Sequence, residues 1–287
     1  MIYIKALSTY HSLKRIDTKQ TLKELTGKIF RRSDRFTQLA LMGAHVVADS
    51  QKLDDKCALY LTSAQANLAV FNRIRDQKYL HNQLPRPVDF INMLSGSASF
   101  YVAKHLGLKG KNISLSHSGF AAQMSLIVAS SELRSGNSTQ VLFGGVDELV
   151  EPLSLHQKIA GVEPSVSLAE GSNFLLLSQD AQDALGAIEL SYKQHSSSEV
   201  IAVIKEHKDL DCISFSARIS QSQRDNMLAG HEVFEVESGY YETAVLFVVA
   251  EFLRSQDSGD KMLFVDRYND RYMSTLIHKM PKGRGSE

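Results

Sequence analysis

Apolar residues along this chain alternate between two kinds of spacing, and this alternation constrains the fold more than any other feature. Short runs with an apolar centre, such as 57–63 and 139–149, are typical of strands. Between such runs, residues 35–49 and 119–136 carry apolar side chains at the spacing of one helix face. Strands that alternate with helices predict an α/β fold.

The same order of elements occurs twice. In residues 1–150 the predicted order is strand, helix, strand, strand, helix and strand. A more compressed version of this order follows in residues 151–280. Residues 281–287 are expected to form a disordered or vector-derived tail. The sequence therefore predicts two similar halves, of which the second is abbreviated.

Several predictions for the second half are more specific. Residues 151–171 have no clean period, which is typical of a crossover or a lid. Residues 173–180 and 186–195 are expected to pair as a hairpin, and Ser198 is expected to cap a helix over 197–207. Helical spacing further on predicts one buried helix face, which consists of Tyr241, Ala244, Val245, Val248, Val249 and Phe252.

The charge balance excludes several functions. The chain has 32 basic and 32 acidic side chains, so it lacks the overall field that nucleic acid or an acidic membrane would require. The basic pair Arg31-Arg32 is expected to be a solvated helix start.

No segment reaches the ~20 apolar residues that span a bilayer, and residues 1–10 are typical of a strand rather than a signal peptide. We expect no nucleic-acid partner, no membrane span and a cytoplasmic location.

Cysteine chemistry is also limited. The two cysteines, Cys57 and Cys212, lie within or beside apolar runs and have neither a second cysteine at metal-binding spacing nor a histidine cluster nearby. A structural zinc site needs four such ligands. We therefore expect two buried strand thiols and no bound metal.

Residues 112–149 carry the most chemical information. A strand over 112–118 runs directly into a helix, so the turn stands at a helix N-terminus, where free N–H groups favour an anion or a thiolate. A serine hydrolase would need Gly-x-Ser-x-Gly at such an elbow. Around Ser118 the frame is Ser-His-Ser-Gly-Phe, and the neighbouring His117 is expected to point away from it. An acyl transferase or hydrolase that uses Ser118 stays an alternative.

This region and its flanks resemble the active-site segment of the β-ketoacyl synthases of the thiolase fold. The shared features are a small-residue stretch opened by Pro85 and Pro87, a Gly-Leu-Lys-Gly turn at 107–110, the elbow and its helix, and a strand that ends in Gly-Gly-Val-Asp-Glu at 144–148. The resemblance covers most of residues 1–280. It implies the thiolase-like fold, in which two similar βαβαβ-type halves form a layered α/β/α/β/α arrangement.

The resemblance also locates the family's catalytic positions. It places the nucleophilic cysteine at Gly119, or one residue earlier at Ser118, and the two histidines near Ser216 and at Tyr240. The family's lysine falls near Glu235. A ketosynthase needs a thiolate to hold the acyl chain and imidazoles to stabilise the enolate. The resemblance therefore implies a chain that has no catalytic residues of its own and needs no cofactor.

An inactive member of this family is the chain-length factor, which shapes the acyl tunnel of an active ketosynthase. The abbreviated second half makes this sequence most similar to the chain-length factors of bacterial aryl polyene type II polyketide synthases. The resemblance implies a heterodimer with a ketosynthase that retains its cysteine. It also implies transient contact with an acyl carrier protein, mainly through that partner.

The resemblance assigns two groups of residues to the partner. Family members pair through the strand before the elbow, which here consists of Asn112, Ile113, Ser114, Leu115 and Ser116. The residues expected to reach the partner's tunnel as its floor are Phe90, Ile91, Met93 and Leu94. Each of these four is equally suited to an ordinary core position. A homodimeric scaffold that binds carrier proteins is a further alternative.

Overall fold

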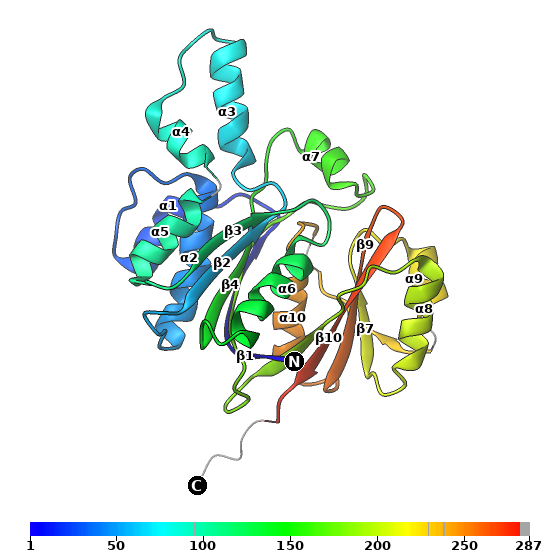
Figure 1. Cartoon of the computed structure of the whole chain (residues 1–287). Coiled ribbons are helices and arrows are strands. Elements are labelled where there is room, and N and C mark those ends of the chain that lie inside the picture. The colour runs from blue at the N-terminus through cyan, green and yellow to red at the C-terminus, as the bar shows by residue number, and fades with distance from the viewer. Residues whose placement is uncertain (95, 229, 238, 282–287) are drawn as a thin grey trace.

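The computed structural model of the chain describes residues 1–94, 96–228, 230–237 and 239–281 (Figure 1). The predicted tail therefore lies outside the described residues, except for Pro281. The strands are β1 (Ile2–Ser12), β2 (Ala58–Ser63), β3 (Asn112–Ser116), β4 (Gln140–Asp147), β5 (Glu170–Ser178), β6 (Gly186–Leu190), β7 (Cys212–Phe215), β8 (Glu232–Val233), β9 (Lys261–Tyr268) and β10 (Arg271–Lys279). The helices are α1 (Thr18–Thr26), α2 (Arg35–Ser50), α3 (Leu68–Tyr79), α4 (Pro87–Met93), α5 (Ser97–Leu106), α6 (Ala121–Arg134), α7 (Leu153–Ala160), α8 (Ser197–Glu206), α9 (Gln221–Met227) and α10 (Val245–Arg254).

The sheet repeats the same strand order in both halves of the chain. Its ten strands run in the order β3-β2-β4-β5-β1-β6-β10-β9-β7-β8. From either edge inward, the order is the third, second, fourth, fifth and first strand of that half. The halves meet where β1 and β6 pair antiparallel, with Ile2 opposite Ile188. The predicted α/β fold with two similar halves is confirmed, although the repeat changes over between β5 and β6. The division of the chain at residue 150 stays a prediction.

Three hydrophobic cores produce the layers. Helices α2 and α5 cover the outer face of β2, β4 and β5, and α8 and α9 cover β7, β9 and β10. The central core contains α6 and α10 and receives residues from both halves of the sheet. Figure 1 shows these two helices in the middle, with the other helix layers to the left and right. The layered α/β/α/β/α arrangement follows.

Small residues let the central layer approach the sheet. A Cβ at Gly145 would lie 2.6 Å from Leu246 Cδ1 on α10, and one at Gly144 would lie 2.2 Å from Phe174 Cε1 on β5. The Gly-Gly pair of the sequence motif thus fits both neighbours because it has no side chains. Cys57 and Cys212 are buried as predicted. Burial raises the pKa of Cys57 to about 12 and that of Cys212 to about 11.

Two local predictions for the second half are wrong. The segments 173–180 and 186–195 do not form a hairpin, because β1 lies between β5 and β6 and pairs with both. Helix α8 is capped by Ser196 rather than Ser198, since the Ser196 side chain accepts from the Glu199 N–H and the Glu199 side chain accepts from the Ser196 N–H. Such a capping box satisfies donors that would otherwise lack a partner.

Two further segments differ in part from expectation. The aperiodic segment 151–171 contains α7, together with a loop that leads into β5. Helix α10 begins at Val245, so Tyr241 lies in the preceding turn, although its side chain is buried as predicted. In the part of the chain that the structure describes, no helix combines the length and apolar character needed to cross a bilayer.

Candidate functional site

The elbow between β3 and α6 lies where the carboxyl ends of parallel strands converge. β2, β3 and β4 are mutually parallel, as are β7 and β9. Open α/β sheets bind ligands at this end of their strands. A small cavity of about 60 Å³ lies here, and its lining includes Ser118, Gly119, Glu148, Arg218, Tyr240 and Tyr268. Ligand pockets usually enclose about 300–1,000 Å³, so this cavity is too small for an acyl chain.

The place of a nucleophile's side chain is occupied by Tyr268. Gly119 has a φ of 76°, and a Cβ built on it would lie 2.3 Å from Cγ of Tyr268. The Tyr268 ring also packs edge-on against Phe120, the N-cap residue of α6. No side chain, cysteine included, fits at position 119 unless Tyr268 moves.

A buried cation lies beside Tyr268. The Arg218 guanidinium carbon is 5.0 Å from the centroid of the Tyr268 ring and 5.1 Å from that of Tyr240. Arg218 pairs with Glu242, and each of the two side chains is only 6% exposed. The Tyr240 hydroxyl donates to Oε2 of Glu242 at 2.6 Å. Buried charges persist when they are paired and hydrogen-bonded in this way.

The predicted catalytic positions fall into two neighbouring cavities. Ser118, Gly119 and Tyr240 share the small elbow cavity. Ser216 borders a second cavity of about 320 Å³, which Tyr240 and Glu242 also line. Glu235 lies on the rim of that second cavity, with its carboxylate 3.8 Å from Nη1 of Arg224. The resemblance thus brought together residues that are far apart in sequence.

Among the described residues, neither of the two histidines near the elbow forms a hydrogen bond to the Ser118 hydroxyl. Its neighbour His117 uses Nδ1 to donate to the carbonyl oxygen of Gly119 at 2.8 Å. His156 on α7 also lines the elbow cavity, but its Nδ1 accepts from the N–H of Val150 at 3.5 Å. Neutral histidine has one acceptor nitrogen, so the second nitrogen of His156 carries a proton. Burial lowers the pKa of His156.

Asp147, from the Gly-Gly-Val-Asp-Glu motif, ties the two halves together. Its Oδ1 accepts from Oγ of Ser63 at 2.7 Å and from the N–H of Ala64 at 3.1 Å. Its Oδ2 accepts from the N–H of Thr243 at 2.8 Å and from Oγ1 of Thr243 at 2.9 Å. Burial raises the pKa of Asp147, and these four bonds oppose that shift. Through these hydrogen bonds, the Asp147 side chain joins the end of β2 to the turn before α10.

The next residue, Glu148, is also buried. Burial and the charge of Asp34 raise its pKa from 4.5 to about 8, against the effect of the N–H of Ala69, which donates to Oε1 at 3.1 Å. Glu148 is thus the group in the elbow cavity that titrates near neutral pH. The sequence motif contained this residue but gave no sign of its burial.

Three residues of the site were not predicted as functional: Arg218, Glu242 and Tyr268. Arg218 had one signal in the sequence, because it lies two residues after Ser216, near which the resemblance places a histidine. The remaining two could not be found from local pattern. Among the described residues, no group of three or more histidine, cysteine, aspartate or glutamate side chains could hold a metal ion.

The predicted dimer strand lies at an edge of the sheet. β3 is the first strand in the strand order, and Ile113 and Leu115 are half-buried. Oγ of Ser114 donates to Oγ of Ser99 at 2.8 Å, which joins β3 to α5. On the same helix the Phe100 side chain is 57% exposed. An unpaired, partly apolar edge is a surface that soluble proteins usually cover.

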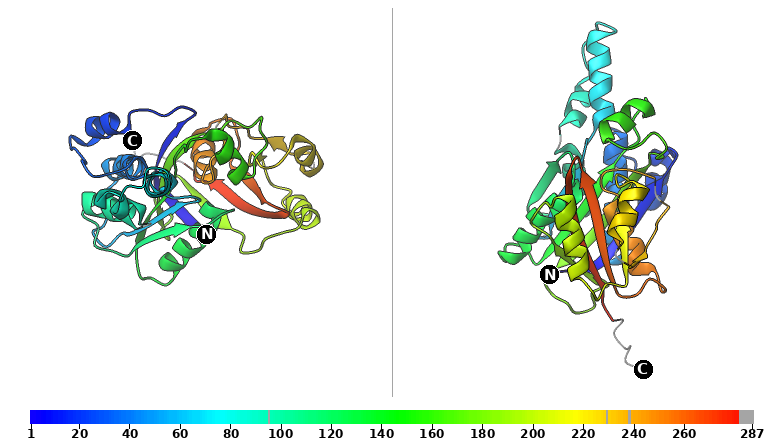
Figure 2. Two further views of the ribbon diagram at one scale, coloured as in Figure 1. Left: turned by 90° about the horizontal axis from the view of Figure 1, so that it is seen from above. Right: turned by 90° about the vertical axis from the view of Figure 1, so that its right-hand side faces the viewer.

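A helical hairpin, residues 68–94, projects from the body beside α5. It consists of α3, a connecting segment and α4, and it projects from the top of the molecule in the right-hand view of Figure 2. Its two helices are held by the buried carboxylate of Asp89, which accepts from Arg73 at 2.6 Å and lies 3.2 Å from Nε of Arg86. Although burial acts against ionisation, Arg73 holds the pKa of Asp89 below its ordinary value.

Large apolar side chains are exposed along this hairpin. Near its tip, Tyr79 is 80% exposed and Leu84 is 87% exposed. The predicted tunnel residues Phe90, Ile91 and Leu94 are exposed as well, and Met93 is half-buried. Exposure of Phe90, Ile91 and Leu94 excludes the core position for these three side chains in the single subunit. A concentration of apolar residues on a protruding element is typical of an interaction surface.

Comparisons with known proteins agree on the fold. No family model and no curated protein sequence matches the chain. Among solved structures, the ishigamide ketosynthase/chain length factor aligns with 91% of this chain and 85% of its own, at 17% identity and a TM-score of 0.72. A chain of the Xenorhabdus doucetiae complex between the ketosynthase ApeO and its chain length factor ApeC aligns over 97% and 98%, at 13% identity and a TM-score of 0.67.

The 3-oxoacyl-(acyl carrier protein) synthase III of Pseudomonas aeruginosa is a third match, with a TM-score of 0.62 over 98% of both chains and 14% identity. These values, together with the repeated strand order and the elbow at the strand ends, define the class. The chain has the thiolase-like fold of the ketosynthases.

Proposed function

We propose that this chain is a non-catalytic, chain-length-factor-like subunit that pairs with an active β-ketoacyl-acyl carrier protein synthase in the cytoplasm. The observation that carries the proposal is the contact between Tyr268 and Gly119, because it removes the space for a nucleophile in the elbow. The groups beside it are the ion pair of Arg218 with Glu242 and the phenol of Tyr240. None of them supplies the thiolate or the imidazoles that a condensation needs.

The exposed apolar surface supports a partner. It begins at the edge strand β3, continues over Phe100 on α5 and reaches Phe90, Ile91 and Leu94 at the end of α4. Obligate subunit interfaces commonly bury 2,000 Å² or more, and a flat sheet edge alone would supply little of that. The projecting hairpin increases the area that a second subunit can cover.

The partner that fits this surface best is a related subunit with an intact elbow. Members of the family that this chain resembles pair across a two-fold axis through the edge strand that corresponds to β3. A subunit of related fold therefore offers a matching sheet edge. Two of the similar structures are of a ketosynthase with its chain length factor. By analogy, we place Phe90, Ile91, Met93 and Leu94 at the floor of the partner's acyl tunnel, in a synthase of the aryl polyene type. Carrier proteins would deliver acyl groups mainly to that partner.

The alternative enzyme that uses Ser118 has less support. Both histidines near the elbow have their Nδ1 atoms engaged with the backbone, and the cavity beside Ser118 is about 60 Å³. Activation of a serine requires a base that can accept its proton. The homodimeric scaffold differs from the proposed heterodimer only in the identity of the partner.

The test is co-expression of this chain with a ketosynthase that retains its cysteine. We expect a stable complex with one copy of each chain, and intact mass measurement after incubation with an acyl carrier thioester should place the acyl group on the ketosynthase only. A partner variant with Cys→Ala at its nucleophile is the control. An adduct mapped to Ser118 would contradict the non-catalytic role, and a chain that forms only homodimers in the mixture would favour the scaffold.

A further inference from the structure

Basic residues gather on one face of a chain whose net charge is zero. Residues 14–32 contain only two acidic side chains, Asp17 and Glu24, against seven basic ones. The basic residues are Lys14, Arg15, Lys19, Lys23, Lys28, Arg31 and Arg32. All seven are exposed, and in the part of the chain that the structure describes none of them forms an ion pair. The sequence pair Arg31-Arg32 is therefore one end of a larger basic surface.

Four of these cations surround a groove. Lys19 and Lys23 on α1, together with Lys28 and Arg31 on the following loop, line a groove of about 390 Å³. The one acidic residue in its lining, Asp17, is engaged as the cap of α1, since its Oδ1 accepts from the N–H groups of Lys19 and Gln20. The groove therefore has an excess of positive charge that nothing in the described chain neutralises.

The same groove has an apolar part. Leu22 is buried in its floor, and Phe30 is half-buried beside it. Ile29 on the rim is 65% exposed. A concave surface with an apolar floor and a cationic rim fits a protruding apolar side chain that is flanked by carboxylates. A nucleic-acid backbone supplies negative charge but no aliphatic protrusion, and the vesicle arm of the test below distinguishes a lipid surface from an acidic protein.

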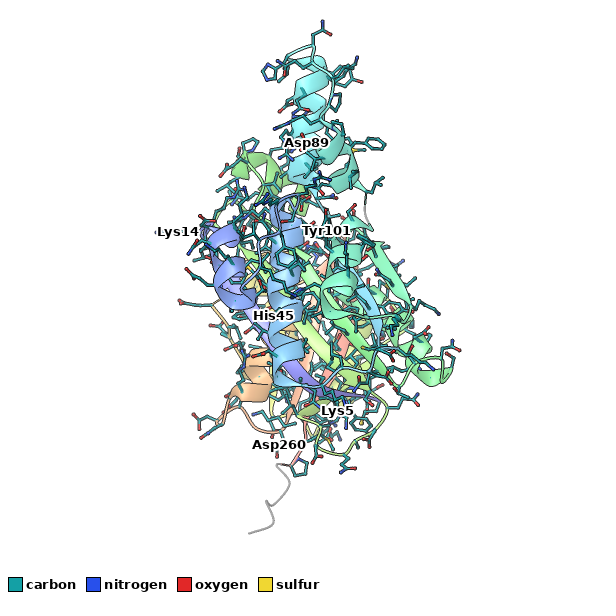
Figure 3. All side chains as sticks on the ribbon, turned by 90° about the vertical axis from the view of Figure 1, so that its left-hand side faces the viewer. Lys5, Lys14, His45, Asp89, Tyr101 and Asp260 are labelled. Atoms are coloured by element: carbon teal, nitrogen blue, oxygen red, sulfur yellow. The ribbon has the colours of Figure 1, made fainter. Side chains whose placement is uncertain are left out.

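The basic surface meets the hairpin at its 28–32 end, where the Arg32 carbonyl oxygen accepts from Nδ2 of Asn92 on α4 at 2.9 Å. The rest of it lies on α1 and the segment just before α1, and α2 packs against both α1 and α5. Figure 3 looks at this side of the molecule, with Lys14 near α1, His45 on α2 and Tyr101 on α5. A partner in the groove beside α1 can thus bind while the edge strand β3 is covered by another subunit.

We propose that the groove between α1 and residues 28–31 docks an acidic protein surface, with a helix whose carboxylates flank an apolar side chain as the element recognised. Lys19, Lys23, Lys28 and Arg31 contact the carboxylates, and the apolar side chain packs on Leu22 and Ile29. Opposite charges on the two surfaces speed their encounter and fix its orientation. The proposal is independent of whether the chain is a chain-length factor.

The test uses the full chain and a fluorescent amphipathic helical peptide with glutamates on both sides of a leucine stripe. Binding is followed by anisotropy. We expect saturable binding that the double variant Lys23→Glu/Lys28→Glu weakens by about tenfold or more, and that raising the salt to about 0.5 M abolishes. Ile29→Ser is expected to weaken it by about fivefold, because an apolar anchor is lost.

Two controls make the test specific. Lys205→Glu/Lys208→Glu reverses the same charge at two exposed lysines near α8 that form no ion pair, and it should bind like the original chain. Thermal unfolding of all variants checks that they fold. The proposal is overturned if the acidic peptide does not bind, if a peptide with glutamine for glutamate binds equally well, or if the control reversal weakens binding as much. Tighter binding to phosphatidylglycerol vesicles or to duplex DNA than to the peptide would also overturn it.

Discussion

The aromatic ring of Tyr268 lies directly against the Cα of Gly119, so that a Cβ at position 119 would come within 2.3 Å of Tyr268 Cγ. Tyr268 ends β9 and Gly119 precedes α6, so one contact joins the two halves of the fold at the elbow. The same Tyr268 ring lies 5.0 Å from the Arg218 guanidinium carbon, and its contact with Gly119 fills the place of a nucleophile's side chain.

The first prediction concerns Gly119→Ala. We expect it to lower the free energy of unfolding by about 2–4 kcal/mol, from strain at positive φ together with overpacking against Tyr268. Gly136→Ala is the matched control, since Gly136 has a φ of 69° and open space where its Cβ would lie. That control should cost about 1–2 kcal/mol from strain alone. Equal losses in denaturant unfolding would show that Tyr268 does not restrict position 119.

The second prediction concerns the buried ion pair. Arg218→Met should lower the free energy of unfolding by about 3–5 kcal/mol, because Glu242 is left charged and without its cation. The double variant Arg218→Met/Glu242→Gln should cost clearly less than the sum of the two single changes, since it removes both charges. A double-mutant cycle by chemical denaturation measures this coupling. Additive losses would mean that the two charges do not interact.

The third prediction concerns pH. The folded chain holds a proton on Glu148 up to about pH 8, whereas the unfolded chain releases it near pH 4.5. Stability should therefore fall as pH rises between these values, by up to about 1.4 kcal/mol per pH unit. Glu148→Gln should remove this fall. The free energy of unfolding of the variant, relative to that of the original chain, should therefore be higher at pH 8 than at pH 5. The exposed Glu206→Gln is the control, and a Glu148→Gln curve parallel to that of the original chain would contradict the assignment.

The fourth prediction concerns the hairpin surface. Phe90→Ala, Ile91→Ala and Leu94→Ala should leave thermal unfolding of the single subunit nearly unchanged, because these side chains are exposed. Each should weaken the complex with a ketosynthase by about 1–3 kcal/mol if it packs at the centre of the interface. In a reconstituted synthase, product length should grow by about one two-carbon unit where the side chain forms the tunnel floor.

Leu185→Ala is the control for that series, since Leu185 is also partly exposed but lies between β5 and β6, in the groove that Lys5 and Pro281 also line. Complex yield and product distribution should both be measured. Unchanged lengths for all of the hairpin variants would end the tunnel-floor assignment, even if the complex were weakened.

The fifth prediction concerns the thiols. Cys57 and Cys212 are buried and their pKa values are raised to about 12 and about 11, so neither is a reactive thiolate at neutral pH. Iodoacetamide at pH 8 should leave the folded chain unmodified and should alkylate both cysteines in denaturant, as seen by intact mass. Rapid alkylation of either cysteine in the folded chain would contradict the prediction, because it would reveal a reactive thiolate outside the elbow.

Sequence pattern sufficed where neighbours in the chain decide the structure. The apolar period of 35–49 predicted α2, and the junction after β3 predicted the elbow. The pattern failed where the partner is distant, since nothing in residues 173–195 indicates that β1 inserts between β5 and β6. The hairpin over 68–94 was missed in part because its apolar residues are exposed and so show no buried face.

The candidate site divides in the same way. Ser118, Gly119 and Tyr240 could be placed together because the resemblance supplied a motif for each. Tyr268 belongs to no such motif, and its role depends on the twist that brings the end of β9 over the elbow. The Tyr268 ring fills the space that a side chain at position 119 would occupy. Neither the β9 segment nor the elbow segment shows this contact in its own sequence.

The position of β1 in the middle of the sheet has a consequence for synthesis on the ribosome. β1 is made first, yet its two neighbours, β5 and β6, begin only at Glu170 and Gly186. At about 5 to 20 residues per second, the first of them is complete roughly 10 to 30 s later. During that interval both edges of β1 lack their partner strands, although Ile2, Ile4 and Ala6 on this strand are buried in the folded chain. The nascent chain therefore requires protection from misassociation until its second half emerges, and a message truncated before β5 should yield an insoluble product rather than a stable half-protein.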